Sequence, residues 1–552
     1  LDVDAKILLP GDMGFTFDSS LLTPGSYDMT RPVDSMQFAA ILRPHGQSIY
    51  LDYRDKNLNV KYVKHKLLKD RTMIFGTSYL CPIYDTVAPN AEIPYPISAK
   101  PFTGSWFEAA QIYKKWALKQ AWCTNRPEVN PLQDIDFWFW NRGLVKDVVP
   151  PIEKLLGDCP QLKIALDWYW WHSNPYDTDY PFFWPPREGE ETFKTAVKRL
   201  TDQGVFTQVY VNGVCWDCDA DTWTLGGNEG VMIKEDGTPR AYAFNKYNNH
   251  RLAWMCGEAP KHHDQILKLM GKLHGSGLSG QYLDMIGCAT HDPCYNPNHS
   301  HNLGGGHYVR DGYRKMLQRI KDTYPDYPIT TETASENYMD LCDGGIICSA
   351  ASAERMGNSQ RNVIPLFTAV YHGSYALFGN YAHPDSIPPW DPKWPDEDRW
   401  QNEKPWHKLY PDQFFVEMAR PIAWGAQPMV CQLRPIVYTD PEFAEEYDFI
   451  KKTAIFYHDH KDILFHGEMI SPDTFSCETF TVDFLSRMIF TKESLARVIT
   501  KELPTVLHSA WQTKDGKQFL ILANVSRSQQ AWKFNQFEGT IQPHTYEAIP
   551  LN

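Results

Sequence analysis

The feature that most constrains the fold is a repeated alternation of short apolar runs and amphipathic helices through the middle of the chain. The runs are too short for core helices and are bounded by Gly or Pro, so buried strands are expected at 136–140, 162–167, 205–211, 278–286 and 329–332. Apolar residues at helical spacing separate them, as in Ile266, Leu269, Met270 and Leu273. Further runs at 345–348, 363–370 and 426–430 would complete eight strands. This alternation predicts an α/β fold, a (β/α)8 TIM barrel.

The chain on either side of the predicted barrel has a different pattern. From residue 1 to 103, short β-type runs such as Ser48–Tyr53 are separated by Gly, Pro and Asn, which predicts an N-terminal β-sandwich. Within 104–130, an apolar stripe from Trp106 to Ala117 predicts a linking helix. Residues 131–467 would form the barrel, and residues 468–552 a small C-terminal β-sandwich.

Bulk properties exclude several classes of partner. At 552 residues the chain is too long for a single core. Its net charge of -13 disfavours nucleic acid and anionic membranes, because phosphate binding needs clustered Lys and Arg. No apolar stretch of the sequence is long enough to span a bilayer. The first residue is Leu1 rather than Met, so a removed signal peptide is one explanation, and we expect a secreted or periplasmic location with a cytoplasmic one left open.

Three carboxylates coincide with the ends of predicted strands. Asp167 ends the second strand, Asp284 lies near the end of the fourth, and Glu332 ends the fifth. Active sites of βα barrels lie at the C-terminal ends of the strands, so the three would face one mouth. Converging carboxylates raise the proton affinity of at least one of them, which is the arrangement that glycoside hydrolysis uses. Asp284 taken alone fits a cap as well as a catalyst, and three unrelated caps or ion pairs are the alternative for the set.

Aromatic and polar residues surround these carboxylates in the sequence. Aromatic residues make up 14% of the chain, and a flat ring with a polar tip suits a sugar, which presents C–H patches and hydroxyls. The residues expected to bind substrate beside Asp167 are Trp168, Trp170, Trp171, Tyr210, Asn212, His299 and His301. Alternation along a strand would turn some of the rings toward the core, and loop histidines without a role are the alternative for His299 and His301.

No metal or other cofactor is expected. Two sets of thiol and imidazole groups have the chemistry to bind zinc, namely Cys294 with His299 and His301, or Cys215 and Cys218 with Cys256. The pattern is weak because no second cysteine pair follows the first at the spacing of a zinc ribbon.

The stretch from His383 to Gln413 is rich in proline, acidic residues and tryptophan. Its tryptophans are Trp390, Trp394, Trp400 and Trp406. A loop of this length inside a compact domain is usually functional, so we predict a lid that supplies aromatic platforms. An arm that packs on a neighbouring domain or subunit is the alternative.

The acidic motifs resemble those of a known group of enzymes. LDWYWW at Asp167, YLDM at Asp284 and TTETASE at Glu332 look like motifs of retaining α-glycosidases that include the endo- and exo-α-N-acetylgalactosaminidase families. The segments WFEAAQIYKKWALKQ and CYNPNHSHNLGGGHY are similar to uncharacterised relatives of that group, so the likeness covers roughly residues 106–345. It implies that Asp284 is the nucleophile, Glu332 the general acid/base, and Asp167 a residue that grips sugar hydroxyls. Glu336 is the alternative acid/base, because a misplaced strand end would exchange the two glutamates, and otherwise belongs to the substrate-binding set.

The residues and the resemblance together predict a retaining glycoside hydrolase. Its substrate would be an oligosaccharide or polysaccharide with an α-linked galactose-type sugar, which is galactose, N-acetylgalactosamine or anhydrogalactose. The alternatives are a catalytically inactive carbohydrate-binding protein and a zinc-dependent hydrolase.

Overall fold

The core of the protein is an eight-stranded sheet with the strand order β21-β19-β18-β16-β12-β11-β10-β22. The computed structural model describes residues 1–552 except 34, 84–91, 175–176, 244–249, 290–291, 386–403, 473, 489–492 and 552. The strands are β10 (Phe137–Trp140), β11 (Ile164–Trp168), β12 (Phe206–Asn212), β16 (Gln281–Asp284), β18 (Ile329–Glu332), β19 (Gly344–Ile346), β21 (Ala376–Phe378) and β22 (Met429–Cys431). All neighbours are parallel. A parallel bridge between Phe378 and Gln427 joins the two ends, so the sheet is a nearly closed barrel, which confirms the predicted fold.

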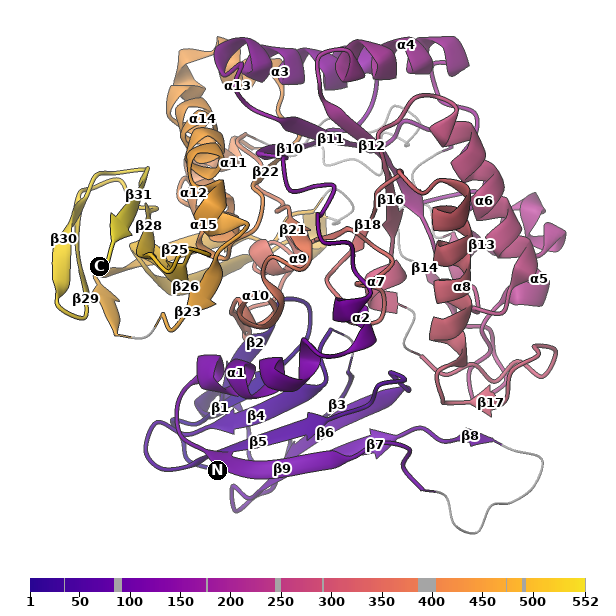
Figure 1. The fold of residues 1–552 in the computed structure, drawn as a ribbon, viewed down its shortest axis with the longest axis horizontal. Coiled ribbons are helices and arrows are strands. Elements are labelled where there is room, and N and C mark those ends of the chain that lie inside the picture. The colour runs from indigo at the N-terminus through magenta and orange to yellow at the C-terminus, as the bar shows by residue number, and fades with distance from the viewer. Residues whose placement is uncertain are drawn as a thin grey trace.

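Helices cover the outside of the barrel (Figure 1). They include α3 (Val145–Asp158), α4 (Glu190–Thr201), α6 (Pro260–His274), α8 (Tyr308–Thr323), α12 (Gln413–Ala423) and α14 (Ala444–Asp459). Each of the predicted helical stripes faces inward; α8, for example, buries Val309, Tyr313 and Ile320. In Figure 1, α3 and α4 lie along the top, α6 and α8 on the right, and α12 and α14 on the left. None of the helices in the described ranges is long and apolar enough to cross a membrane.

One predicted barrel strand, 363–370, is wrong. The chain there forms the edge strand β20 (Asn362–Val363), followed by helix α10 (Leu366–Tyr371), and the seventh barrel strand is β21 instead. All six residues of α10 are buried. A short run that is apolar on every side shows neither the period of a strand nor that of a helix, so the sequence does not distinguish the two. Pro365 at the N-cap of α10 is the local feature compatible with a helix start.

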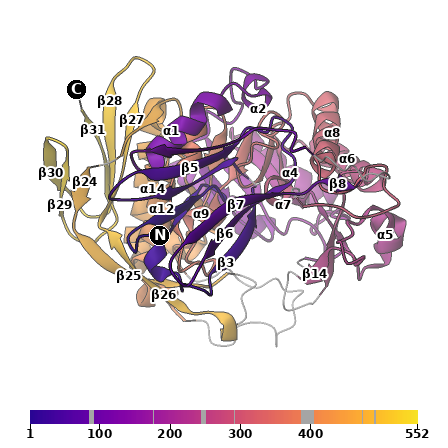
Figure 2. The same ribbon diagram turned by 90° about the horizontal axis from the view of Figure 1, so that it is seen from below.

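The predicted N-terminal β-sandwich is present below the barrel (Figures 1 and 2). Its larger sheet contains β1 (Lys6–Leu9), β2 (Phe15–Asp18), β4 (Phe38–Leu42), β5 (Ser48–Tyr53), β9 (Ile97–Phe102) and β20. The smaller sheet contains β3 (Asp28–Pro32), β6 (Lys61–Leu67) and β7 (Met73–Tyr79). Ile7, Phe17 and Ala39 from the larger sheet meet Val63 and Leu67 from the smaller one in a shared core.

The predicted linking helix is α1 (Trp106–Ala117), which lies between the sandwich and the barrel (Figure 1). Ser105 and Glu108 form a capping box at its start, so two free N–H groups of the first turn are bonded. Its buried face contacts α10 and β4, which joins the two parts of the chain.

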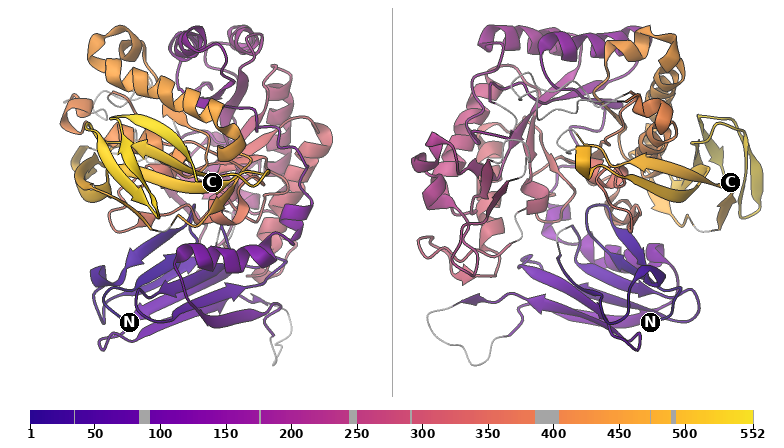
Figure 3. Two further views of the ribbon diagram at one scale, coloured as in Figure 1. Left: turned by 60° about the vertical axis from the view of Figure 1, so that its left-hand side comes forward. Right: turned by 180° about the vertical axis from the view of Figure 1, so that it is seen from behind.

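The C-terminal region also forms β-sheets, as expected. One sheet contains β23 (Glu468–Ile470), β27 (Val506–Gln512), β28 (Gln518–Asn524) and β31 (Thr545–Pro550), and the second contains β24 (Phe475–Cys477), β29 (Gln530–Phe534) and β30 (Phe537–Ile541). A separate pair, β25 (Thr479–Leu485) and β26 (Val498–Pro504), reaches from these sheets toward the barrel (Figure 3, right). The boundaries between the domains stay predictions.

Most of the predicted lid falls outside the described residues. Trp390, Trp394 and Trp400 all lie within 386–403. Trp406 begins the short helix α11 (Trp406–Leu409).

Candidate active site

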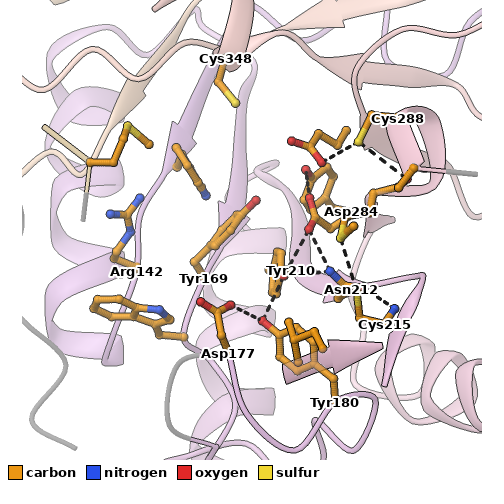
Figure 4. A pocket seen from close by; sticks show the side chains of 18 of the residues that line it. Arg142, Tyr169, Asp177, Tyr180, Tyr210, Asn212, Cys215, Asp284, Cys288 and Cys348 are labelled. Carbon is orange, nitrogen blue, oxygen red and sulfur yellow. Dashed lines mark hydrogen bonds between the residues drawn. The ribbon is translucent and has the colours of Figure 1, made fainter. Parts of the chain in front are cut away.

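A cavity of about 330 Å³ lies where the barrel strands end (Figure 4). This is the end of a βα barrel at which the loops that follow the strands build binding sites. The carboxylates of Asp284 and Glu332 belong to its wall. Aromatic rings provide much of the remainder, and they are Trp140, Tyr169, Trp170, Tyr180, Tyr210, Tyr242, Trp254, Tyr282 and Tyr381. A concave, largely aromatic site with a few convergent polar groups is the form expected of a small-molecule site.

Asp284 ends β16, and three donors hold its carboxylate. The Tyr282 hydroxyl donates to Oδ1 over 2.7 Å, and Tyr282 stands two residues earlier on the same face of the strand. From the neighbouring strand β12, the Tyr210 hydroxyl and the Asn212 amide donate to Oδ2 over 3.2 Å and 3.1 Å. Figure 4 shows this network around Asp284. A carboxylate fixed by three donors has a defined direction in the cavity and needs no rearrangement before it acts.

Desolvation is the main influence on the charge of Asp284. Burial raises its pKa to about 6, and the bonds from Tyr282, Tyr210 and Asn212 oppose that rise. Hydrogen bonds to a charged carboxylate favour the charged form, so without these donors the group would be harder to ionise.

Glu332 ends β18, the next strand of the barrel. The Cys288 thiol, from the short helix α7 (Ile286–Ala289), donates to Glu332 Oε2 over 3.0 Å. Burial first, and the neighbouring charge of Asp284 second, raise the pKa of Glu332 to about 8. Two carboxyl groups in one enclosed site therefore have different proton affinities, and Glu332 is the one that retains its proton to higher pH.

The strand register places these two residues side by side. Leu283 of β16 pairs with Thr331 of β18, and Asp284 and Glu332 follow directly on each strand. Adjacent strands are about 4.8 Å apart. Retaining glycosidases hold their two carboxyl groups about 5–5.5 Å apart, so the backbone spacing suits that class.

Asp167 lies deeper than the sequence interpretation placed it. It is on β11 with an exposed fraction of 0%, and it is not among the residues of the cavity wall. Its neighbour Trp168 faces helix α4, so Asp167 faces the barrel interior. Burial and the charge of Asp284 raise the pKa of Asp167 well above its usual range. The structure thus brings Asp167 near Asp284 as a buried acid beneath the cavity and not as a group of its wall.

The tryptophans after Asp167 divide between core and cavity. Trp168 and Trp171 both pack against Phe193 of α4, with indole N–H groups bonded to the carbonyls of Gly143 and Tyr210. They are part of the core, whereas Trp170 and Tyr169 line the cavity. Trp170 has a φ of 56°, which bends the chain at the strand end and breaks simple alternation.

Glu336 occupies a separate, fully enclosed place. It has an exposed fraction of 1% and accepts bonds from the hydroxyls of Tyr113 and Tyr371, at 2.6 Å and 2.5 Å, and from the Gln37 amide at 3.1 Å. These donors come from α1, α10 and the N-terminal sandwich, so Glu336 connects that sandwich to the barrel. It is absent from the cavity wall, whereas Glu332 is part of it. Glu336 therefore lies where the sandwich meets the barrel and does not contact the cavity.

His299 and His301 also lie away from the cavity wall. They meet Cys256 and Cys294, and one ligand atom from each of the four residues lies within 4.8 Å of all the others. The structure therefore combines members of the two metal sets considered from the sequence. Cys215, which the second set placed with Cys256, instead lines the cavity, and its thiol donates to the Met285 sulfur over 3.5 Å.

Several cavity residues were missed by the sequence interpretation. Asp177 follows β11 in a loop, and its Oδ1 accepts the Tyr180 hydroxyl over 2.9 Å; the Tyr180 oxygen in turn lies 3.1 Å from that of Tyr210. Asp177 and Tyr180 both lie in a loop that follows a barrel strand, and this position is the feature of the sequence that could have identified them as site residues. Tyr242 and Trp254 come from an inserted three-stranded sheet, and Met488 comes from the C-terminal region. No pattern in the sequence connects either segment with the barrel mouth.

The sequence of this chain is similar to a known family and to several named proteins. A family model described as "Domain of unknown function (DUF6259)" matches residues 91–383. A protein of Bacteroides thetaiotaomicron named "Putative glycoside hydrolase" is 24% identical over 95% of this chain and 72% of its own length. A second, "Putative glycoside hydrolase 22789" of Monosiga brevicollis, is 24% identical over 70% of this chain, which spans only 36% of that longer protein.

Solved structures with a similar fold include two sugar-cleaving enzymes by name. The α-N-acetylgalactosaminidase NagBb of Bifidobacterium bifidum, in complex with Gal-NHAc-DNJ, aligns with a TM-score of 0.60 at 12% identity, covering 98% of this chain and 80% of its own. The GH36 α-galactosidase AgaA of Geobacillus stearothermophilus aligns with a TM-score of 0.54 at 11% identity, covering 99% and 73%. The resemblance predicted from the acidic motifs is thus confirmed at the level of the fold.

Proposed function

This chain belongs to the DUF6259 family, and we propose that it is a retaining glycoside hydrolase that releases an α-linked galactose-type sugar. Two sequence relatives named as glycoside hydrolases support the reaction class. The names of the solved neighbours, an α-N-acetylgalactosaminidase and an α-galactosidase, support the choice of N-acetylgalactosamine or galactose.

The observation that carries the proposal is the pair of carboxyl groups at adjacent strand ends in one cavity. Asp284 has a pKa of about 6 and Glu332 a pKa of about 8. Between these values the dominant form of the pair has Asp284 ionised and Glu332 protonated. That is the state a double displacement requires at its start, with one carboxylate free to attack and one acid free to donate.

The reaction would proceed in two steps. In the first, Glu332 donates its proton to the glycosidic oxygen while Asp284 forms a bond to the anomeric carbon, and the leaving alcohol departs. In the second, the Glu332 carboxylate takes a proton from water, whose oxygen displaces Asp284 from the sugar. Glu332 is thereby protonated again and Asp284 is again a carboxylate. Tyr282, Tyr210 and Asn212 orient Asp284 and are positioning residues for it.

The cavity wall offers suitable contacts for one sugar ring. Tyr169 and Trp170 line the cavity, and aromatic rings suit the C–H surface of a pyranose. The Arg142 guanidinium lies 4.7 Å from the ring centre of Trp140 and 5.7 Å from that of Trp170, and points into the same space (Figure 4). Its N–H groups and the Asp177 carboxylate are placed to bond sugar hydroxyls.

The first test measures the reaction and its stereochemistry. Aryl α- and β-glycosides of galactose, N-acetylgalactosamine and anhydrogalactose are incubated with the purified protein, and proton NMR follows the first-formed anomer. We expect hydrolysis of an α-glycoside with release of the α-anomer, and loss of turnover in Asp284→Asn with an unchanged circular dichroism spectrum. First release of the β-anomer would contradict the retaining mechanism. Sugar binding without hydrolysis of any substrate would indicate a carbohydrate-binding protein instead.

The second test assigns the acid/base. Glu332→Gln should lower kcat/KM far more for glycosides with poor leaving groups than for activated aryl glycosides, because only the former need a proton. Glu332→Ala with azide should yield an α-glycosyl azide from an activated substrate. Glu336→Gln is the matched control, four residues away and outside the cavity. If Glu336→Gln shows the leaving-group dependence and Glu332→Gln does not, the assignment fails.

A further inference from the structure

Four potential metal ligands converge outside the active-site cavity. Cys256 follows β15 (Arg251–Trp254) of the inserted sheet, and Cys294, His299 and His301 lie between α7 and β17 (Leu303–Gly304). Both thiols are buried and both imidazoles are half-buried. Two cysteines and two histidines are a common ligand set of structural zinc sites.

The separations match a tetrahedral zinc centre. The Cys256 sulfur lies 3.2 Å from His301 Nε2, and the Cys294 sulfur lies 3.5 Å from His299 Nδ1. Zinc bonds of about 2.0 Å to nitrogen and about 2.3 Å to sulfur in a tetrahedron separate these two ligand atoms by about 3.5 Å. The whole set lies within 4.8 Å, so a single ion can reach all four atoms with small side-chain movements.

The remaining ring nitrogens have the partners that a metal site requires. His301 Nδ1 lies 2.8 Å from the Asn302 carbonyl, and His299 Nε2 lies 3.0 Å from the Glu229 carbonyl. A ring N–H that donates to a carbonyl fixes the tautomer and leaves the other ring nitrogen with its lone pair. In His301 that nitrogen is Nε2, which faces the Cys256 sulfur. His299 Nε2 lies between the Glu229 carbonyl and the Asn296 side-chain amide, 3.1 Å from the latter, and its Nδ1 faces the Cys294 sulfur.

Backbone contacts hold the ligand-bearing segments next to one another. Cys294 and Gly304 exchange two backbone hydrogen bonds, and the Cys256 N–H donates to the Gly230 carbonyl over 2.8 Å. The Tyr295 N–H donates to Ile233 in the inserted region over 2.8 Å. The site is therefore assembled by the fold as well as by its side chains.

We propose that Cys256, Cys294, His299 and His301 bind one structural zinc ion. Four protein ligands fill the coordination of a tetrahedral ion and leave no position for water, and none of the four lines the cavity, so the site is not catalytic. This inference goes beyond the proposed hydrolase activity and does not depend on it.

The site would attach one wall of the active-site cavity to the barrel. Trp254, which lines the cavity, is two residues before Cys256, and Tyr242 is on the adjacent strand β14 (Ala241–Ala243). Beside the proposed metal site, the ion pair of Arg240 with Asp292 at 2.5 Å connects the same two segments. The Arg240 guanidinium also lies 4.0 Å from the Trp254 ring centre. The metal cross-link would hold both aromatic side chains in place relative to the barrel.

Elemental analysis tests the proposal directly. The full chain is purified without a histidine tag, and its zinc content is measured by mass spectrometry after gel filtration. We expect about one zinc per chain in the wild type and in Cys218→Ser, a control in the same inserted region, and almost none in Cys256→Ser or His301→Ala. A metal-free wild type in which Cys256 and Cys294 are both alkylated, or are joined in a disulfide, would overturn the proposal.

Cobalt provides a readout that does not depend on variants that may be unstable. The wild type is stripped with a chelator and reloaded with Co²⁺, and absorption in the thiolate charge-transfer region is recorded. We expect one Co²⁺ per chain with a tetrahedral, thiolate-ligated spectrum, and displacement of the cobalt by zinc. A spectrum without thiolate ligation would refute the assigned ligands. Loss of zinc should also lower the melting temperature, whether or not glycosidase activity is found.

Discussion

The hydrogen bond from Tyr282 to Asp284 gives a quantitative test of the proposed ionisation states. Tyr282→Phe removes the shortest of the three donors to the carboxylate, at 2.7 Å, and leaves Tyr210 and Asn212 in place. Tyr282 is 1% exposed, so water does not readily replace its hydroxyl. Loss of a bond to the charged form disfavours ionisation and raises the pKa of Asp284.

The size of the effect follows from the energy of such a bond. A hydrogen bond to a charged group contributes about 1.5–3 kcal/mol, and about 1.4 kcal/mol corresponds to one pKa unit. The pKa of Asp284 should therefore rise from about 6 by about 1–2 units, toward that of Glu332, which is about 8. The range in which Asp284 is ionised while Glu332 is protonated then becomes narrow.

The measurement is the pH dependence of kcat/KM on an activated α-glycoside. The wild type should show a bell-shaped profile with an acid limb near the pKa of Asp284 and a basic limb near that of Glu332. In Tyr282→Phe the acid limb should move to higher pH by about 1–2 units and the maximum should fall. Tyr327→Phe is the control, because Tyr327 is buried and does not line the cavity, and it should leave the profile unchanged. An acid limb that does not move in Tyr282→Phe would show that Asp284 is not the group that titrates there.

Two further predictions separate structural from substrate-binding roles. Burial raises the pKa of Glu336 to about 7, so its protonated form stabilises the fold below the unfolded pKa, and that contribution is lost as pH rises through about 7. The free energies of unfolding of wild type and Glu336→Gln are measured in urea at each pH. Their difference should fall by about 2–3 kcal/mol from about pH 5 to about pH 8. A difference that stays constant with pH would refute this account. Trp170→Phe should raise KM several-fold because Trp170 lines the cavity, whereas Trp168→Phe should lower the melting temperature and leave KM unchanged because its ring packs on Phe193. Equal effects of the two tryptophan substitutions on KM would contradict the division between core and cavity.

The repeated part of the fold could be predicted because it depends on local periodicity. Strand-like runs and amphipathic stripes recur along the chain, and each can be recognised within a window of a few residues. The exception, 363–370, is a run without either period, and in the structure its helix α10 is fully buried and packs against α1. The parallel order then places Asp284 and Glu332 side by side, since consecutive strands of a barrel are neighbours.

The parts of the candidate site that could not be predicted depend on contacts between distant segments. In the sequence, Glu336 is a plausible acid/base. In the structure, its carboxyl group is enclosed by Tyr113 and Gln37, which lie more than two hundred residues earlier in the chain. The φ of Trp170, not strand alternation, decided which tryptophan faces the cavity. Cys256 lies beside His301 in the structure, but the sequence does not show where the loop that carries His301 lies.

Hydrophobic periodicity and strand order are properties of the local chain, so the barrel and its two strand-end carboxylates could be recognised before the fold was seen. Which polar groups share the cavity, which are enclosed elsewhere, and how far burial raises each pKa could be read only from the folded arrangement. Desolvation and hydrogen bonding depend on what surrounds a side chain in space, and for Asp284, Glu332 and Glu336 most of those surroundings come from other parts of the chain.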